Sequence, residues 1–350
     1  MWMKQPMVSK IFKFSLMGCG TFVVLVIALV SWISFALFSG PDAMDTSSPF
    51  HPFRSEKAKA QYLTHYDLRA KEWPVSSESR LVETSYGETF VRISGPVDAP
   101  PLVLLPGGGA TSLIWRRNVR DLSDHFRTYA VDNVYDFGRS THSRSMTSTD
   151  DCLAWLDELF RVLELGDKIN LAGLSYGGWL AGQYAVNHPD RLAGVVLVAP
   201  AATVLPFSGE FLWRSAVCVI PLRHFTQSTM DWVWEDLVRE GENGRRITDD
   251  RVEDVMLAFR SFKFRMPVNP TVLTDAELEG LSVPALFLIG ENEKIYSAQD
   301  AVHRLEQVAP HIKTTVLPGT GHDLTILRST AVNTAIIDFL ETLGPVSPAG

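Results

Sequence analysis

The chain has 350 residues, 46% of them hydrophobic, so it has enough apolar side chains to bury a substantial core. Its formal charge of −8, without a cluster of Lys and Arg, argues against nucleic acid as a partner. The three cysteines, Cys19, Cys152 and Cys218, are too few for a disulfide scaffold and lack metal-ligand spacing, so no metal site is predicted. Cys152 and Cys218 are interpreted as two buried thiols, with a disulfide between them as the alternative.

Residues 16–38 contain no charged side chain, and the run is long enough to cross a bilayer as a helix. A cleaved signal peptide usually has a shorter apolar region of roughly 7 to 15 residues and a small-residue cleavage site. The run therefore predicts an uncleaved single-pass transmembrane anchor. Because lysines and no acids precede it, we expect residues 1–15 to be cytoplasmic and the chain after residue 38 to be extracytoplasmic.

Residues 39–79 are predicted to form a linker followed by an accessory helix over residues 55–73. Alternating apolar and polar residues then predict a hairpin, with strands at residues 80–86 and 88–94. This hairpin is expected to open the sheet of the main domain.

From residue 102 onward, short apolar runs alternate with segments of helical composition. The expected strands are residues 102–105, 127–131, 169–174, 192–199, 284–289 and 314–317. The expected helices are residues 112–124, 149–165, 298–308 and 329–343, and one that starts directly after the third of these strands. This alternation predicts an α/β fold, with a mostly parallel sheet covered by helices on both faces. Its two parts are residues 80–201 and 284–350.

The alternation stops over residues 202–283, where we predict a helical cap. Helical stretches are expected near residues 210–219, 229–240 and 249–264. Most of the many aromatic side chains here are expected to pack the cap itself. A few are expected to line an apolar substrate pocket, because an insertion between two core strands lies over the edge of the sheet.

Residues 173–177, Gly-Leu-Ser-Tyr-Gly, stand between an apolar run and a segment with helical spacing. This pattern is typical of a nucleophile elbow, in which glycines permit a tight and strained turn. The turn would present the Ser175 hydroxyl above a helix N-terminus, which favours developing negative charge. Ser175 is therefore predicted to be a nucleophile, and the alternative is an ordinary structural turn.

A serine nucleophile needs a base, and the base needs an acid that orients it. His322 follows the last expected strand in a glycine-rich loop, and it is predicted to be the base. Two acids, Glu291 and Glu293, follow the preceding strand. Backbone N–H groups would stabilise an oxyanion, one from Tyr176 and one from the loop Pro-Gly-Gly-Gly at residues 106–109.

With these motifs in the order Ser, acid, His, the chain resembles the α/β-hydrolase superfamily over residues 80–343, and within it the carboxylesterase-like members with a helical lid. The resemblance implies the triad Ser175, Glu293 and His322, an oxyanion hole formed by Gly108 and Tyr176, and no metal or organic cofactor. Residues 132–140 are similar to a structural loop of that family. Two departures are Pro106, where the family usually has His, and Glu293, where Asp is more usual.

Membership of this family implies hydrolysis of small or medium carboxylic esters through an acyl-enzyme on Ser175. Thioesterase, aminopeptidase, carbon–carbon bond hydrolase and perhydrolase activities stay open, because the fold hosts many chemistries. A non-catalytic binding protein of the same fold is the alternative from a different class. The expected partners are a small acyl substrate and the membrane, through the N-terminal helix.

Overall fold

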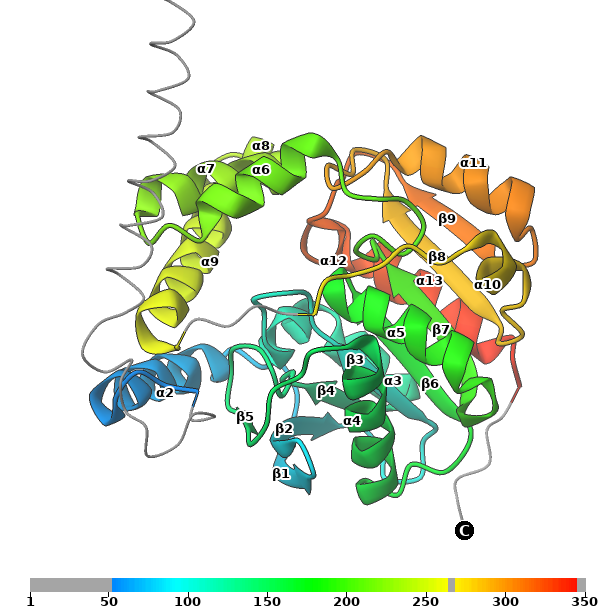
Figure 1. Ribbon diagram of the computed structural model, residues 1–350, viewed down its shortest axis with the longest axis horizontal. Coiled ribbons are helices and arrows are strands. Elements are labelled where there is room, and N and C mark those ends of the chain that lie inside the picture. The colour runs from blue at the N-terminus through cyan, green and yellow to red at the C-terminus, as the bar shows by residue number, and fades with distance from the viewer. Residues whose placement is uncertain (1–51, 264–267, 345–350) are drawn as a thin grey trace, which may run out of the picture. The chain divides into compact units, whose positions relative to one another are not determined.

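The computed structural model describes residues 52–263 and 268–344, whose strands and helices are drawn in Figure 1. The strands are β1 (Glu78–Thr84), β2 (Gly87–Ser94), β3 (Pro101–Leu105), β4 (Arg127–Val131), β5 (Thr141–His142), β6 (Ile169–Leu174), β7 (Leu192–Val198), β8 (Ala285–Gly290) and β9 (Lys313–Leu317). These described strands form one sheet in the order β1-β2-β4-β3-β6-β7-β8-β9, with β5 paired to β2. β2 is antiparallel to β1, β4 and β5, whereas every pair from β4 to β9 is parallel. The mostly parallel sheet predicted from the sequence is confirmed.

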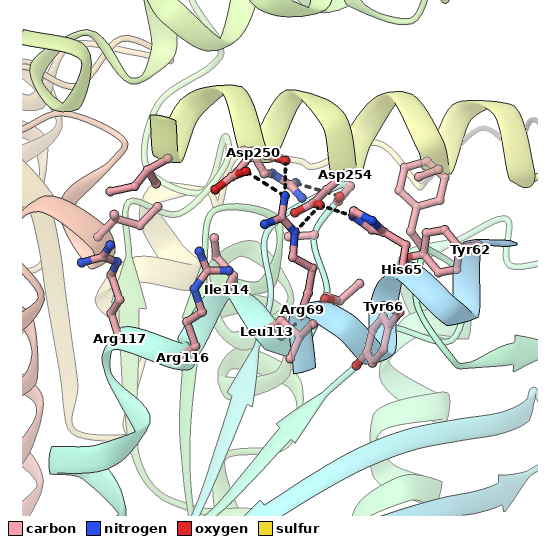
Figure 2. A pocket seen from close by; sticks show the side chains of 18 of the residues that line it. Tyr62, His65, Tyr66, Arg69, Leu113, Ile114, Arg116, Arg117, Asp250 and Asp254 are labelled. Atoms are coloured by element: carbon pink, nitrogen blue, oxygen red, sulfur yellow. Dashed lines mark hydrogen bonds and ion pairs between the residues drawn. The ribbon is translucent and has the colours of Figure 1, made fainter. Parts of the chain in front are cut away.

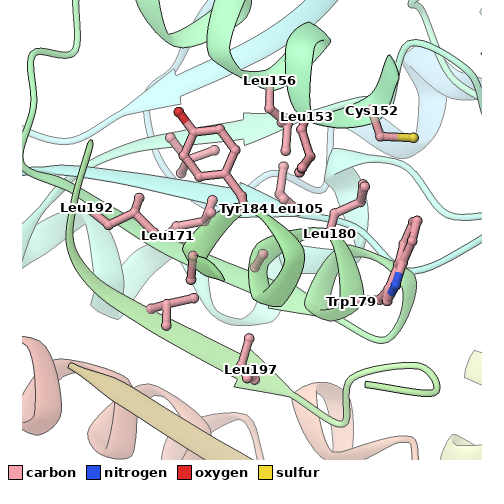
Figure 3. Packing of buried hydrophobic residues seen from close by; sticks show 14 of the residues in the cluster. Leu105, Cys152, Leu153, Leu156, Leu171, Trp179, Leu180, Tyr184, Leu192 and Leu197 are labelled. Carbon is pink, nitrogen blue, oxygen red and sulfur yellow. The ribbon is translucent and has the colours of Figure 1, made fainter. Parts of the chain in front are cut away.

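The strands β3, β6, β7 and β8 are buried on both faces, because alternate side chains point to opposite sides and apolar clusters cover both. In β3, Val103 and Leu105 belong to one apolar cluster, whereas Leu102 and Leu104 belong to the other. Helices α4 and α5 pack in the first cluster, which Figure 3 shows, and α3 and α13 pack in the second. The C-terminal ends of the parallel strands therefore form one edge between two helical layers.

The helices alternate with the strands, as the sequence pattern predicts, except within the cap. They are α2 (Glu56–Ala70), η2 (Ser112–Arg117), α3 (Val119–His125), α4 (Thr149–Val162), α5 (Tyr176–Asn187), η3 (Pro189–Arg191), α6 (Gly209–Cys218), α7 (Arg223–Val233), α8 (Glu235–Arg239), α9 (Glu242–Ser261), α10 (Asp275–Glu279), α11 (Ala298–Val308), α12 (Leu324–Leu327) and α13 (Ser329–Glu341). Of these, η2 and η3 are 3₁₀-helices.

One predicted helix, residues 112–124, is interrupted in the structure. The 3₁₀-helix η2 ends before Asn118, and the α-helix α3 begins after it. The buried Asn118 side chain donates from Nδ2 to Oδ1 of Asn333 in α13, at 2.8 Å. A long-range partner therefore holds the residue where the helix changes its geometry, and a local helical pattern cannot reveal such a partner.

The described part of the cap contains helices α6 to α10, and it lies between β7 and β8 in the chain. Figure 1 shows α6, α7 and α8 close together, with α9 extending from them toward α2. Arg69 of α2 donates to Asp250 and Asp254 of α9, both at 3.1 Å. The accessory helix before the sheet therefore supports the longest helix of the cap.

Two predictions about other parts of the chain have different outcomes. The predicted anchor at residues 16–38 lies outside the described residues, and within the described ranges no helix is long and apolar enough to cross a membrane. Cys152 and Cys218 are both buried and free, so the interpretation as two thiols holds. Burial raises the pKa of the Cys152 thiol to about 12 and also raises that of Cys218.

Candidate active site

Ser175 lies between β6 and α5, in a backbone conformation that L-residues rarely adopt, with φ 52° and ψ −114°. The turn is tight enough to exclude side chains at its glycines. A Cβ on Gly173 would lie 2.0 Å from the carbonyl oxygen of Gly177, and a Cβ on Gly177 would lie 2.6 Å from that of Leu105. Glycine at both positions therefore permits the strand to turn directly into the helix beneath the Ser175 hydroxyl.

Backbone hydrogen bonds hold Ser175 to the end of the neighbouring strand β7. Its N–H donates to the carbonyl of Val198 at 2.8 Å, and its carbonyl accepts from Ala201 at 2.9 Å. Next to Ala201, the carbonyl of Pro200 accepts from the Tyr296 hydroxyl at 2.8 Å. The serine turn is thus connected to the loop that follows β8.

His322 and Glu293 form a buried pair in the loops after β9 and β8. His322 Nδ1 lies 2.9 Å from Glu293 Oε2, and the Glu293 side chain is 0% exposed. Its other oxygen, Oε1, accepts from the N–H groups of Lys294 at 2.7 Å and Ile295 at 3.0 Å. The exposed Glu291 instead accepts the N–H of Gly319 at 3.1 Å. Of the two candidate acids, the structure therefore places Glu293 on the histidine.

Opposing effects act on the His322 imidazole. Burial disfavours its charged form and lowers its pKa, but the nearby charge of Glu293 and its hydrogen bond to Nδ1 outweigh burial. The net result is a pKa for His322 above the ordinary value of 6.5. Because Nδ1 is occupied by Glu293, Nε2 is the nitrogen left to exchange a proton with another group.

The loops after β8 and β9 approach each other too closely for a side chain at Gly290. A Cβ at this position would lie 2.4 Å from the carbonyl oxygen of Thr320 and 2.5 Å from that of Gly321. Asn292 donates its N–H to the Thr320 carbonyl at 3.0 Å. Glycine at the end of β8 therefore lets the histidine loop, residues 318–323, pack directly on the acid loop.

The glycine loop, residues 106–111, passes directly beside the serine turn. A Cβ on Gly107 would lie 3.3 Å from Cβ of Ser175, and a Cβ on Gly108 would lie 3.6 Å from Cβ of Tyr176. The N–H of Gly109 already donates to Asp136 Oδ2 at 2.8 Å. In the described part of the chain, no hydrogen bond occupies the N–H of the exposed Gly108. Gly108 and Tyr176 are therefore neighbours, and Gly108 has an N–H available to a ligand.

The described residues contain no hydrogen bond between Ser175 Oγ and His322. Such bonds are often long without substrate and tighten when substrate binds. The five residues predicted for the site all lie at the C-terminal ends of β3, β6, β8 and β9, four of them in loops and Tyr176 as the first residue of α5. This arrangement supplies a nucleophile, a base with an oriented imidazole, and backbone donors.

The model of the alpha/beta hydrolase fold family matches residues 100–328, which contain every one of these loops. The chain belongs to the α/β-hydrolase family. Among its relatives, carboxylesterase YbfK of Bacillus subtilis is 31% identical, over 82% of this chain and 96% of that protein.

Solved structures agree with this assignment. The chain is similar to the crystal structure of naproxen esterase (carboxylesterase NP) from Bacillus subtilis, with a TM-score of 0.75 and 30% identity, over 81% of this chain and 99% of the other. The crystal structure of carboxylesterase CesB (YbfK) from the same organism gives a TM-score of 0.72 at 28% identity, over 81% and 98%. This α/β-hydrolase is thus an enzyme, and it matches relatives named carboxylesterases over nearly their whole length.

Sequence reasoning missed two residues that hold the glycine loop of this α/β-hydrolase. The Gly109 peptide is bound on both sides, since Asp136 accepts from its N–H and Arg251 of α9 donates from Nη2 to its carbonyl at 2.7 Å. Gly109 has φ +67°. These bonds at Gly109 hold the loop that begins at Pro106, the position where the family usually has His. Asp136 follows β4, the neighbour of β3 in the sheet, and this position is a weak signal in the sequence. The sequence around Arg251 gives no indication of its role.

Proposed function

We propose that this protein is a serine carboxylesterase in which Ser175, His322 and Glu293 form the triad and Gly108 and Tyr176 form the oxyanion hole. The observation that supports it most directly is the buried bond between His322 and Glu293 at the sheet edge that also presents the strained Ser175. Buried carboxylate and histidine pairs of this kind orient the imidazole and stabilise its charged form.

In the proposed reaction, Ser175 Oγ attacks the ester carbonyl carbon while His322 Nε2 takes the hydroxyl proton. The negative charge on the carbonyl oxygen is stabilised by the N–H groups of Gly108 and Tyr176. His322 then gives its proton to the departing alcohol, which leaves an acyl group on Ser175. A water molecule, deprotonated by His322, attacks this acyl-enzyme, and His322 returns the proton to Ser175 Oγ as the bond to the acyl group breaks and the carboxylic acid is released.

Replacing the nucleophile tests this proposal. Ser175→Ala is expected to abolish covalent labelling by a fluorophosphonate and to lower ester turnover by at least about 10³-fold. Ser76→Ala, at an exposed serine far along the chain from the site, is the matched control and is expected to keep both. Labelling of Ser175→Ala at the level of the control would refute the assignment of Ser175, and absence of labelling in the wild type would favour a non-catalytic binding protein.

The bond cleaved is the second part of the proposal. A panel of ester, thioester and aminoacyl substrates of matched acyl length is expected to give the highest kcat/KM with the ester. This expectation is supported by the carboxylesterase names of the relatives that match most of the chain. A thioester or aminoacyl substrate hydrolysed faster than the ester would keep the mechanism and change the substrate class.

We also propose that residues 16–38 anchor the protein in a membrane, with residues 1–15 in the cytoplasm and the catalytic domain outside it. The uncharged apolar run and the lysines before it support this orientation. The full chain is expected to stay in the membrane fraction after carbonate washing, and protease added to spheroplasts is expected to reach the catalytic domain. Full-length protein released by carbonate would contradict the anchor.

A further inference from the structure

A cavity opens at the cap side of the glycine loop, between α2, η2 and α9 (Figure 2). Its volume is about 70 Å³. Its walls include Gly109 and Ala110 of the glycine loop and Ile326 of α12, the helix that follows His322. Trp234 of the cap also lines it. The cavity is therefore adjacent to the proposed reaction centre, since Gly109 is the next residue after Gly108.

The charges around this cavity are mostly positive, in a protein whose formal charge is −8. Arginines predominate among its charged lining residues, which are His65, Arg69, Arg116, Arg117, Asp250, Arg251 and Asp254. The two acids already have partners. Asp254 binds His65 at 2.6 Å and Arg69 at 3.1 Å, and Asp250 binds Arg69 at 3.1 Å. Arg116 lies 3.5 Å from Glu72.

Among the described residues, no ion-pair partner lies within 4 Å of two lining arginines, Arg117 of η2 and Arg251 of α9. Within residues 52–263 and 268–344, the hydrogen bond that Arg251 donates goes to the uncharged carbonyl of Gly109. Figure 2 shows Arg116 and Arg117 pointing from η2 toward α9, across the cavity. Burial lowers the pKa of Arg251, although the nearby charges of Asp254 and Asp136 oppose this, and partial burial together with the charge of Arg116 lowers the pKa of Arg117. A bound anion would favour the charged form of both side chains.

We infer that this cavity is a subsite for a carboxylate on the substrate, so that the enzyme prefers esters with a terminal carboxylate over neutral esters of the same length. Arg251 and the exposed Arg117 would bind it, since guanidinium groups pair with carboxylates in a planar, two-pronged geometry. This inference rests on the proposed esterase function.

The position of Arg251 limits the length of the substrate. Arg251 binds the carbonyl of Gly109, one residue beyond the proposed oxyanion donor Gly108. One or two Cα–Cα steps correspond to about 4 to 8 Å, which a chain of roughly three to five carbon atoms spans. Half-esters of dicarboxylic acids such as glutarate have this spacing between the ester carbonyl and the free carboxylate.

The test compares the 4-nitrophenyl half-ester of glutaric acid with 4-nitrophenyl pentanoate, whose acyl chain is equally long and neutral. The measured quantity is the ratio of kcat/KM for the half-ester to kcat/KM for the neutral ester. The wild-type ratio is expected to exceed one. Arg117→Gln is expected to lower this ratio about tenfold, as loss of one charge-assisted hydrogen bond generally does. Its turnover of the neutral ester is expected to stay within about threefold of wild type. Arg245→Gln, an exposed arginine of the same helix as Arg251, is the control for net charge and is expected to leave the ratio unchanged.

Arg251 needs separate treatment because it also holds the glycine loop. Arg251→Gln is expected to slow both esters, with an additional loss of about tenfold for the half-ester alone, whereas Arg251→Lys should recover part of the ratio because it keeps the charge. A second readout is the affinity of the Ser175→Ala variant for the glutarate half-ester, measured by calorimetry. Adding Arg117→Gln to this variant should weaken the affinity about tenfold.

The outcomes separate this inference from the proposed function. If Ser175→Ala still turned over esters, the proposed mechanism would fail. If Ser175→Ala were inactive but the ratio were the same in wild type, Arg117→Gln and Arg245→Gln, the carboxylate subsite alone would be refuted. A ratio that Arg245→Gln lowered as much as Arg117→Gln would also refute it, because a general charge effect would then explain the preference.

Discussion

Asp323, the residue after His322, accepts the backbone N–H of Leu237 in cap helix α8, with an N–O distance of 2.7 Å. The same carboxylate accepts from Thr320 Oγ1 at 2.7 Å and from the N–H of Gly321 at 3.0 Å. Asp323 is 1% exposed, and burial raises its pKa despite these bonds. One buried carboxylate thus fixes the shape of the histidine loop and ties it to the cap.

The first prediction is that Asp323→Ala destabilises the protein and lowers turnover together. Loss of the carboxylate leaves buried donors without an acceptor, which costs about 1–3 kcal/mol in the free energy of unfolding. It also frees His322 to move away from Ser175, so kcat is expected to fall at least about tenfold, as small displacements of catalytic groups generally cause. Urea unfolding and ester turnover measure the two effects, and Asp338→Ala, at an exposed acid of α13, is the control. Equal effects of the two variants would show that Asp323 does not position the loop.

The second prediction separates the two glutamates. Glu293→Gln is expected to lower kcat by about 10³- to 10⁴-fold, because an amide holds the imidazole in the wrong tautomer and cannot balance its charge. Glu291→Gln is expected to stay within about tenfold of wild type, since Glu291 is exposed and accepts only a backbone N–H that an amide oxygen also satisfies. The reverse ranking would transfer the role to Glu291.

The third prediction concerns pH. The base must be neutral to accept a proton, so kcat/KM is expected to rise with pH, with its midpoint above 6.5 because the pKa of His322 is raised. Glu293→Gln should move this midpoint down, because it removes the charge that raises the pKa. The stabilising effect of the protonated His322 is fully present below 6.5, the ordinary value, and is lost as pH rises through the folded-state pKa. An activity midpoint below 6.5 in the wild type would contradict the role of Glu293.

The fourth prediction tests the close approach of the acid and histidine loops. Gly290→Ala introduces a Cβ that would lie 2.4 Å from the Thr320 carbonyl oxygen, so the backbone must shift. The expected cost is about 1–3 kcal/mol of stability, the usual range for overpacking, together with a loss of ester turnover. Gly209→Ala is the matched control, because nothing lies within 4 Å of the added Cβ. Thermal unfolding and turnover of Gly290→Ala at the level of this control would show that the loops can separate without consequence.

Local features of the sequence were sufficient to predict the serine turn and the sheet. The elbow at residues 173–177 depends on glycines within two residues of Ser175, and the strands depend on short apolar runs, so both signals are contained in a few neighbouring residues. His322 was found because a glycine-rich loop after the last strand must emerge at the same edge of a parallel sheet. The family resemblance added the choice of Glu293.

Other features were decided only by tertiary structure. From the sequence alone, Glu293 was favoured and Glu291 stayed an alternative, and the packing of the two loops at Gly290 buries Glu293 against His322 and leaves Glu291 exposed. The hydrogen bond between Arg251 and Gly109 joins residues 142 positions apart in the chain, and the bond between Asp323 and Leu237 joins residues 86 positions apart. No local period or turn motif encodes such pairs, because they form only when the cap folds back over the ends of the strands.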